Sequence, residues 1–179
     1  MLEKRSKYDK KVDCAGACIE YTRAIELFLF ESIYQRYKEY RSDQGWEHVK
    51  TIGKKEYDED RITLGQYGPI FGIAKNSEDM KDSERDRYEE EHGRYISFCK
   101  EEMLYGSKTE EEIADIADKE YQKINQIKER YRDRSAHRLG VEIDVLACCE
   151  NDILSGEDAL FVMLMDDIHA PEYEIGGGL

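Results

Sequence analysis

The chain has 179 residues, 41 of them acidic and 27 basic, which leaves a formal net charge of −14 at pH 7. This length suits one domain that buries a core without help from disulfides or metal, and the acidic excess argues against a protein that coats nucleic acid non-specifically. Only two prolines occur, and strong helix formers recur throughout. The composition therefore predicts an all-α protein.

The first half of the chain predicts a long amphipathic helix from about Lys10 to Tyr40, because apolar residues recur there at three- and four-residue steps. Residues 41–61 are polar and glycine-containing, which indicates a connection. Thr63 is expected to cap a second helix that runs to Ala74.

A second polar connection is expected over residues 76–87, before a third helix that carries Tyr88 to Met103 and ends at Gly106. The clearest helix start follows. Ser107 or Thr109 precedes three consecutive glutamates, which the positive end of a helix dipole favours. Apolar residues at helical spacing then extend this helix to the region of residue 132.

The last part of the chain is less regular. Residues 141–149 alternate between apolar and acidic at first, which fits either a short strand or the entrance to another helix. Ser155 and Asp158 form a capping-box pattern for a final helix from Glu157 to about His169, and residues 172–179 are expected to be a flexible tail. The whole pattern predicts a single domain of about five helices over residues 1–179.

The most apolar segment, residues 159–165, is far too short to span a bilayer. The five cysteines do not form the even framework of a disulfide-stapled secreted domain. We therefore expect a cytoplasmic protein without membrane contact. A four-thiolate zinc site is conceivable; its ligands would be Cys14, Cys18, Cys148 and Cys149. The first two fall on an apolar helical stripe, however, so core packing is the preferred interpretation and neither metal nor cofactor is expected.

A basic cluster marks the end of the helix that follows the glutamates. Residues 119–138 contain seven basic and three acidic side chains, a local charge of +4. Cleavage of RNA needs a base for the ribose 2′-OH, an acid for the leaving oxygen and a cation for the phosphorane. Histidine titrates near neutrality, while arginine stays charged and binds phosphate through paired donors. Arg132 and His137 are therefore the candidate catalytic residues.

The six letters R-D-R-S-A-H at residues 132–137 resemble the signature of HEPN domains, helical proteins whose common motif is Arg-Asn-x-x-Ala-His. Arg132, Ala136 and His137 match, and Asp133 replaces the usual Asn with another polar residue. Outside the motif the resemblance is architectural: a HEPN-like helical bundle with a long first helix and a long helix leading into the motif.

The resemblance implies a metal-independent endoribonuclease that cleaves RNA at a composite dimer cleft and leaves a 2′,3′-cyclic phosphate, in a toxin–antitoxin or antiphage defence system. It assigns catalysis to Arg132 and His137, with Asp133 orienting the pair. The flanking side chains expected at the RNA are Tyr131, Arg134 and Arg138. A homodimer would place two copies of the single motif histidine around one cleft. The implied partners are RNA, a second copy of the chain and an antitoxin or sensor protein.

Two other functions fit the same residues. The basic cluster also suits a solvated helix end, in which case the chain is a non-catalytic HEPN-like scaffold that binds a protein or nucleotide partner. Alternatively, it is a regulatory or antitoxin-like component whose basic strip binds another acidic protein. His48, His92 and His169 lack ligand spacing, so surface or capping roles are expected for them.

Overall fold

The computed structural model describes residues 14–46, 51–52, 55–56, 62–73, 80–133, 135 and 143–167. These residues are helical almost throughout, apart from two strands of two residues each, β1 (Thr51–Ile52) and β2 (Lys55–Glu56), which pair antiparallel. The predicted all-α class is confirmed. Within the described ranges, every helix is too short or too polar to serve as a membrane-spanning segment.

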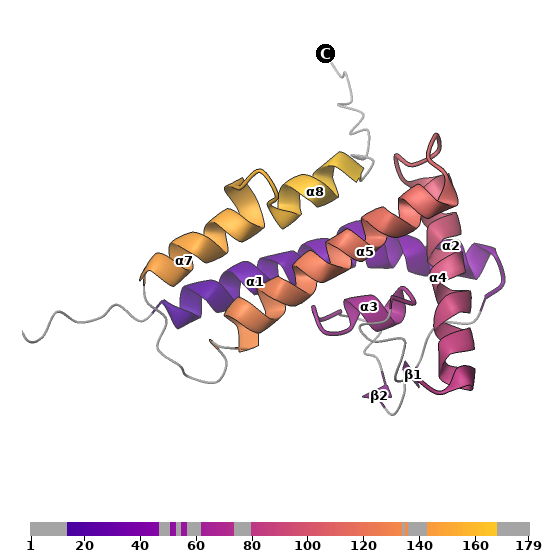
Figure 1. Cartoon of the computed structure of the whole chain (residues 1–179), viewed down its shortest axis with the longest axis horizontal. Helices are drawn as coiled ribbons and strands as arrows, with labels where there is room; N and C mark the ends of the chain where they lie inside the picture. The colour runs from indigo at the N-terminus through magenta and orange to yellow at the C-terminus, as the bar shows by residue number, and fades with distance from the viewer. Residues whose placement is uncertain are drawn as a thin grey trace, which may run out of the picture.

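The first helix is a long rod in which α1 (Ala15–Leu29) runs through a π-helical turn, η2 (Phe30–Tyr34), into α2 (Gln35–Asp43) (Figure 1). Its buried stripe includes Leu29, Ile33 and Tyr37, spaced four apart. Such spacing drifts around an ideal α-helix, and the wider π turn keeps the stripe on the core.

The predicted first helix is thus confirmed in type but displaced at both ends. It begins at Ala15 rather than near Lys10, which lies outside the described residues, and it continues to Asp43. The expected connection at 41–61 therefore starts too early. The reason is Arg41, which is buried against Glu91 of another helix and so belongs to the core-facing side of α2.

The expected helix from Thr63 to Ala74 is wrong over most of its length, because within the described stretch 62–73 only α3 (Tyr67–Ile70) is helical. The amide and hydroxyl of Thr63 donate instead to Oε1 of Gln66, at 2.8 and 2.9 Å. Gly72 ends this segment with a φ of +71°, a conformation that L side chains rarely adopt.

The third helix, α4 (Asp82–Glu102), confirms the prediction over Tyr88 to Glu102 but begins inside the expected connection at 76–87. Its first turns are exposed and highly charged. Arg85 pairs with Asp82 at 2.7 Å and lies 3.9 Å from Glu89. Such pairs, with acidic residues in the first turn, stabilise a helix start without apolar periodicity.

The helix start after the third helix is confirmed at Thr109, which caps α5 (Glu110–Ile127) through a reciprocal capping box. The Thr109 hydroxyl accepts from the Glu112 amide at 3.2 Å, and the Glu112 carboxylate accepts from the Thr109 amide at 2.7 Å. The helix continues as a π-helical segment, η4 (Lys128–Asp133), and so delivers Arg132 to its end as predicted.

The C-terminal part is helical, which resolves the open choice at 141–149: α7 (Ile143–Glu150) runs into η5 (Asn151–Ser155), and α8 (Leu160–Asp167) follows. The capping box expected at Ser155 is wrong. Gly156 turns the chain there and donates to the Asn151 carbonyl at 2.8 Å, so the last helix starts only at Leu160. The predicted end near His169 and the tail 172–179 lie outside the described residues.

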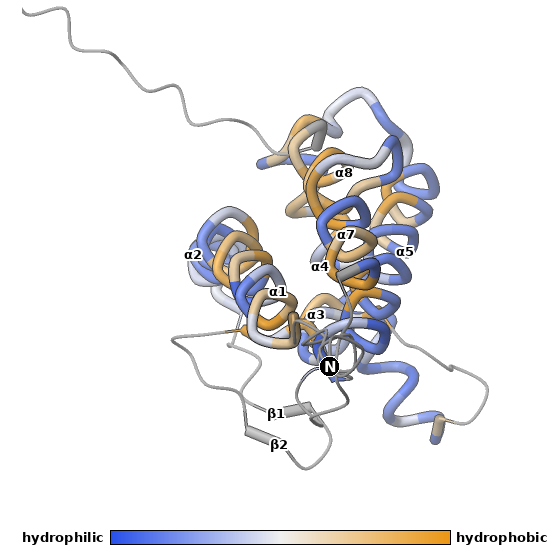
Figure 2. The backbone as a smooth tube through the Cα atoms, turned by 90° about the vertical axis from the view of Figure 1, so that its left-hand side faces the viewer, coloured by the Kyte–Doolittle hydropathy of each residue, from blue (hydrophilic) through white to orange (hydrophobic). Residues whose placement is uncertain are grey.

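The helices pack around one cluster of buried apolar side chains. In Figure 1, α1 and α5 run along each other, α7 and α8 lie above them, and α4 crosses near the N-terminal end of α5. Figure 2 shows polar and apolar residues alternating along the tubes, so that each long helix has one apolar face. Aromatic rings pack between the helices. The ring centroids of Tyr37 in α2 and Phe98 in α4 are 5.3 Å apart, and those of Phe28 in α1 and Phe161 in α8 are 4.5 Å apart.

Candidate functional site

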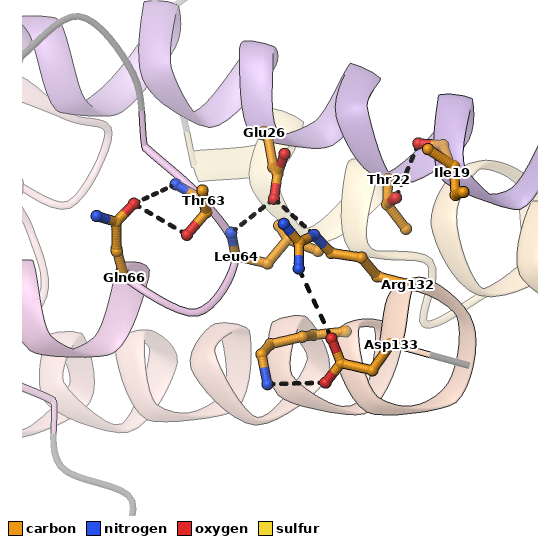
Figure 3. A network of polar contacts seen from close by, with 9 residues as sticks. Ile19, Thr22, Glu26, Thr63, Leu64, Gln66, Arg132 and Asp133 are labelled. Atoms are coloured by element: carbon orange, nitrogen blue, oxygen red, sulfur yellow. Dashed lines mark hydrogen bonds and ion pairs between the residues drawn. The ribbon is translucent and has the colours of Figure 1, made fainter. Parts of the chain in front are cut away.

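Arg132 lies at the junction of three segments that are far apart in the sequence. Its Nε is 3.2 Å from Oε1 of Glu26 in α1, and the same carboxylate oxygen accepts the Leu64 amide at 3.1 Å (Figure 3). The Glu26 side chain is 16% exposed and the Arg132 side chain 36%. The arginine is thus anchored at Nε while part of its side chain remains exposed.

Asp133 contacts the other side of the same guanidinium. Its Oδ1 is 3.6 Å from Nη1 of Arg132, and its Oδ2 accepts from Nζ of Lys128 at 3.1 Å (Figure 3). The structure therefore brings together Arg132 and Asp133, two of the predicted site residues. Three further predicted residues lie outside the described ranges; these are Arg134, His137 and Arg138.

Tyr131 points into the core, and its ring is only 1% exposed. Its hydroxyl donates to the Asp152 carboxylate in η5. Burial and this hydrogen bond raise the pKa of the Tyr131 phenol above its usual value. Tyr131 lies beside Arg132 in sequence as expected, but its buried face cannot stack on an RNA base.

The Asp152 carboxylate accepts hydrogen bonds from three side chains. Besides Tyr131, it accepts from Nζ of Lys123 at 3.4 Å and from Nη1 of Arg130 at 3.2 Å. Burial alone would raise the pKa of this carboxyl, but the hydrogen bond from Tyr131 and the two cations outweigh it and hold the pKa below its usual value. Asp152 thereby ties η5 to the α5–η4 helix.

Carboxylates from outside the basic segment reduce its charge. Residues 119–138 carry a formal charge of +4, and Glu26 and Asp152 contribute two negative charges through their ion pairs. The formal charge of the segment and these two carboxylates together is +2. Arg130 remains 62% exposed despite its contact with Asp152. The two arginines that still offer surface to a ligand among the described part of the segment are Arg130 and Arg132.

The cysteines other than Cys148 behave as core side chains, as predicted for Cys14 and Cys18. Cys14, Cys18, Cys99 and Cys149 are buried and Cys148 is exposed. The thiols of Cys18 and Cys149 contact each other, and burial raises the pKa of both. Nowhere in the described ranges do three or more His, Cys, Asp or Glu side chains gather in a way that would hold a metal ion.

His92 of α4, for which a surface or capping role was expected, is half-buried. Its Nε2 is buried and has no hydrogen-bond partner among the described residues. Burial lowers the pKa of the imidazole, and the Asp118 charge opposes this only in part. His48 and His169 lie outside the described ranges.

Sequence reasoning missed Glu26 and Asp152, the two carboxylates that organise the basic segment. A signal existed for Glu26, which is the single charged residue in the apolar run 24–30. Such an isolated carboxylate needs a partner once the helix is packed. Asp152 stands among ordinary polar neighbours, and nothing in the local pattern distinguishes it.

Comparisons with protein-family models, with curated proteins and with solved structures found no match to this chain.

Proposed function

We propose that this protein is a metal-independent endoribonuclease with a HEPN-like helical bundle, in which Arg132 and His137 are the catalytic residues. The observation that carries the proposal is the placement of Arg132. It stands at the end of a long helix, contacts Glu26 and Asp133, and keeps 36% of its side chain exposed. This is the arrangement that a phosphate-binding arginine needs, because a held guanidinium loses less freedom when it meets an anion.

In the proposed reaction the ribose 2′-oxygen attacks phosphorus while His137 removes its proton. Arg132 stabilises the negative charge of the phosphorane, the bond from phosphorus to the 5′-oxygen breaks, and that oxygen takes a proton. The products are a 2′,3′-cyclic phosphate and a 5′-hydroxyl. A homodimer would supply a second copy of His137 as the acid. We place the enzyme in the cytoplasm, in a toxin–antitoxin or antiphage system in which an antitoxin or sensor protein controls it.

A second candidate is a non-catalytic HEPN-like scaffold that binds a protein or nucleotide partner. One observation favours it: the cations of the basic segment are engaged by carboxylates of the same chain. Those that form ion pairs are Lys123, Lys128, Arg130 and Arg132. In a scaffold these contacts would serve only to join the helices.

The test is incubation of mixed cellular RNA with the wild type, His137→Ala and Arg132→Gln in excess EDTA. Arg23→Gln is the matched control, because Arg23 is an exposed arginine in an i,i+3 pair with Glu20 on α1. We expect cleavage by the wild type and by Arg23→Gln only. Equal folding of all four proteins is checked by circular dichroism and thermal unfolding.

Each outcome separates the two candidates. Cleavage that needs both Arg132 and His137 and leaves cyclic-phosphate ends supports the nuclease. Cleavage that survives in both variants would point to a contaminating enzyme and contradict the proposed site. No cleavage by any of the four proteins, alone or with a protein that copurifies with the wild type, would favour the scaffold.

A further inference from the structure

We propose that Glu26 is a positioning residue for Arg132: its carboxylate holds the guanidinium in the place where it would meet an RNA phosphate. The substrate in this inference rests on the proposed function, whereas the contact itself does not.

Glu26 is held in place independently of Arg132. It projects from α1, and its Oε1 accepts the backbone amide of Leu64 at 3.1 Å. Leu64 is completely buried, and the turn that it begins is closed by Gln66, which accepts from both the amide and the hydroxyl of Thr63 (Figure 3). The carboxylate therefore has a fixed position before the arginine meets it, which is the condition for one side chain to orient another.

The nitrogens of the guanidinium are used unequally. Nε faces Glu26 at 3.2 Å and Nη1 lies 3.6 Å from Asp133. Arginine carries five N–H donors, and the two carboxylates contact only part of them. Since arginine stays protonated at all relevant pH values, the two carboxylates orient the group without removing its charge. The donors that the carboxylates leave unused are available to a phosphate oxygen.

The opposite role for Glu26 would be inhibition, in which the carboxylate competes with phosphate for Arg132. Inhibition requires that Glu26 occupy the donors that a phosphate would use. The contact instead involves Nε, one of the five N–H donors of the guanidinium, and the Arg132 side chain remains 36% exposed. The two roles predict opposite effects of neutralising Glu26: loss of activity for a positioning residue and gain for an inhibitor.

The experiment compares wild type with Glu26→Gln, Glu26→Asp and Glu20→Gln. Gln keeps an acceptor for Leu64 but removes the charge, and charge-assisted hydrogen bonds are about twice as strong as neutral ones. Glu20 is the matched control, an exposed carboxylate on α1 that pairs with Arg23. Two quantities are measured: the side-chain Nε–H signal of Arg132 by ¹H–¹⁵N NMR, assigned from its loss in Arg132→Lys, and kcat and KM on an RNA oligonucleotide.

We expect a slowly exchanging Arg132 Nε–H signal in wild type and Glu20→Gln, and its loss by exchange in Glu26→Gln. We expect kcat to fall roughly 10- to 100-fold in Glu26→Gln with little change in KM, and partial recovery in Glu26→Asp. Thermal unfolding confirms that the variants fold.

Unchanged or increased kcat in Glu26→Gln would overturn the positioning role while leaving the nuclease intact. If wild type cleaves no RNA, the proposed function fails and the Nε–H signal alone decides whether Glu26 holds Arg132. An Arg132 Nε–H that exchanges equally fast in wild type and Glu26→Gln refutes the contact and with it the inference.

Discussion

Replacing Asp152 by alanine is expected to destabilise the protein by about 2–4 kcal/mol. The carboxylate loses a hydrogen bond from the buried Tyr131 hydroxyl, and hydrogen bonds to charged groups contribute about 1.5–3 kcal/mol. Its contacts with Lys123 and Arg130 add less, about 0–1 kcal/mol each, because Arg130 in particular is largely exposed. Loss of Asp152 therefore loosens η5 from the helix that carries Arg132.

The assay is urea unfolding of Asp152→Ala, Tyr131→Phe and the double variant at neutral pH. Tyr131→Phe removes only the hydroxyl, so it should cost about 1.5–3 kcal/mol, and the double variant should cost less than the sum of the two. The pKa of Asp152 is lowered in the folded state, so its contribution is present above the unfolded pKa of about 3.9 and is lost as pH falls below it. Strict additivity of the two changes would refute the coupling.

Two further predictions concern backbone and pH. Gly72→Ala should be more destabilising than Gly45→Ala by about 1–3 kcal/mol. Both glycines have a φ of +71°, but a Cβ at Gly72 would meet the His92 amide nitrogen at 2.2 Å, whereas a Cβ at Gly45 would meet open space. Equal losses of stability in thermal unfolding would contradict this close approach. Because burial lowers the folded pKa of His92, the unfolded chain binds a proton more readily, and the free energy of unfolding should fall as pH drops below about 6.5. His92→Gln should weaken that dependence between about pH 7.5 and about pH 5.5, and identical pH slopes for the two proteins would show that another group is responsible.

The sequence predicted a helix well where a local capping pattern and the spacing of its apolar residues match the side of the helix that is buried. The capping box at Thr109 and the apolar spacing that follows it identified α5 and its arrival at Arg132. The start of α4 was missed because exposed Arg85 ion pairs, rather than a buried stripe, support its first turns. The helix expected after Thr63 was reduced to one turn by the close approach of α4 at Gly72, which is a tertiary constraint.

In the candidate site, too, residues within the local motif were predicted and residues from distant segments were missed. The motif identified Arg132 and Asp133 from neighbouring positions in the chain, where a short pattern is sufficient. Glu26 and Asp152 reach the same segment from 106 residues before Arg132 and 20 residues after it, and no local pattern encodes such distances. Their contribution became visible only once helix packing placed α1 and η5 against the α5–η4 helix.

The most direct test of the central claim uses one RNA oligonucleotide and its fully 2′-deoxy analogue, each incubated with wild type and Arg132→Gln in EDTA, with product ends identified by mass spectrometry. The proposed chemistry requires the ribose 2′-OH, so wild type should cut only the RNA and leave a 2′,3′-cyclic phosphate, and Arg132→Gln should cut neither. Cleavage of the deoxy analogue, 3′-hydroxyl ends, or full activity of Arg132→Gln would contradict the account.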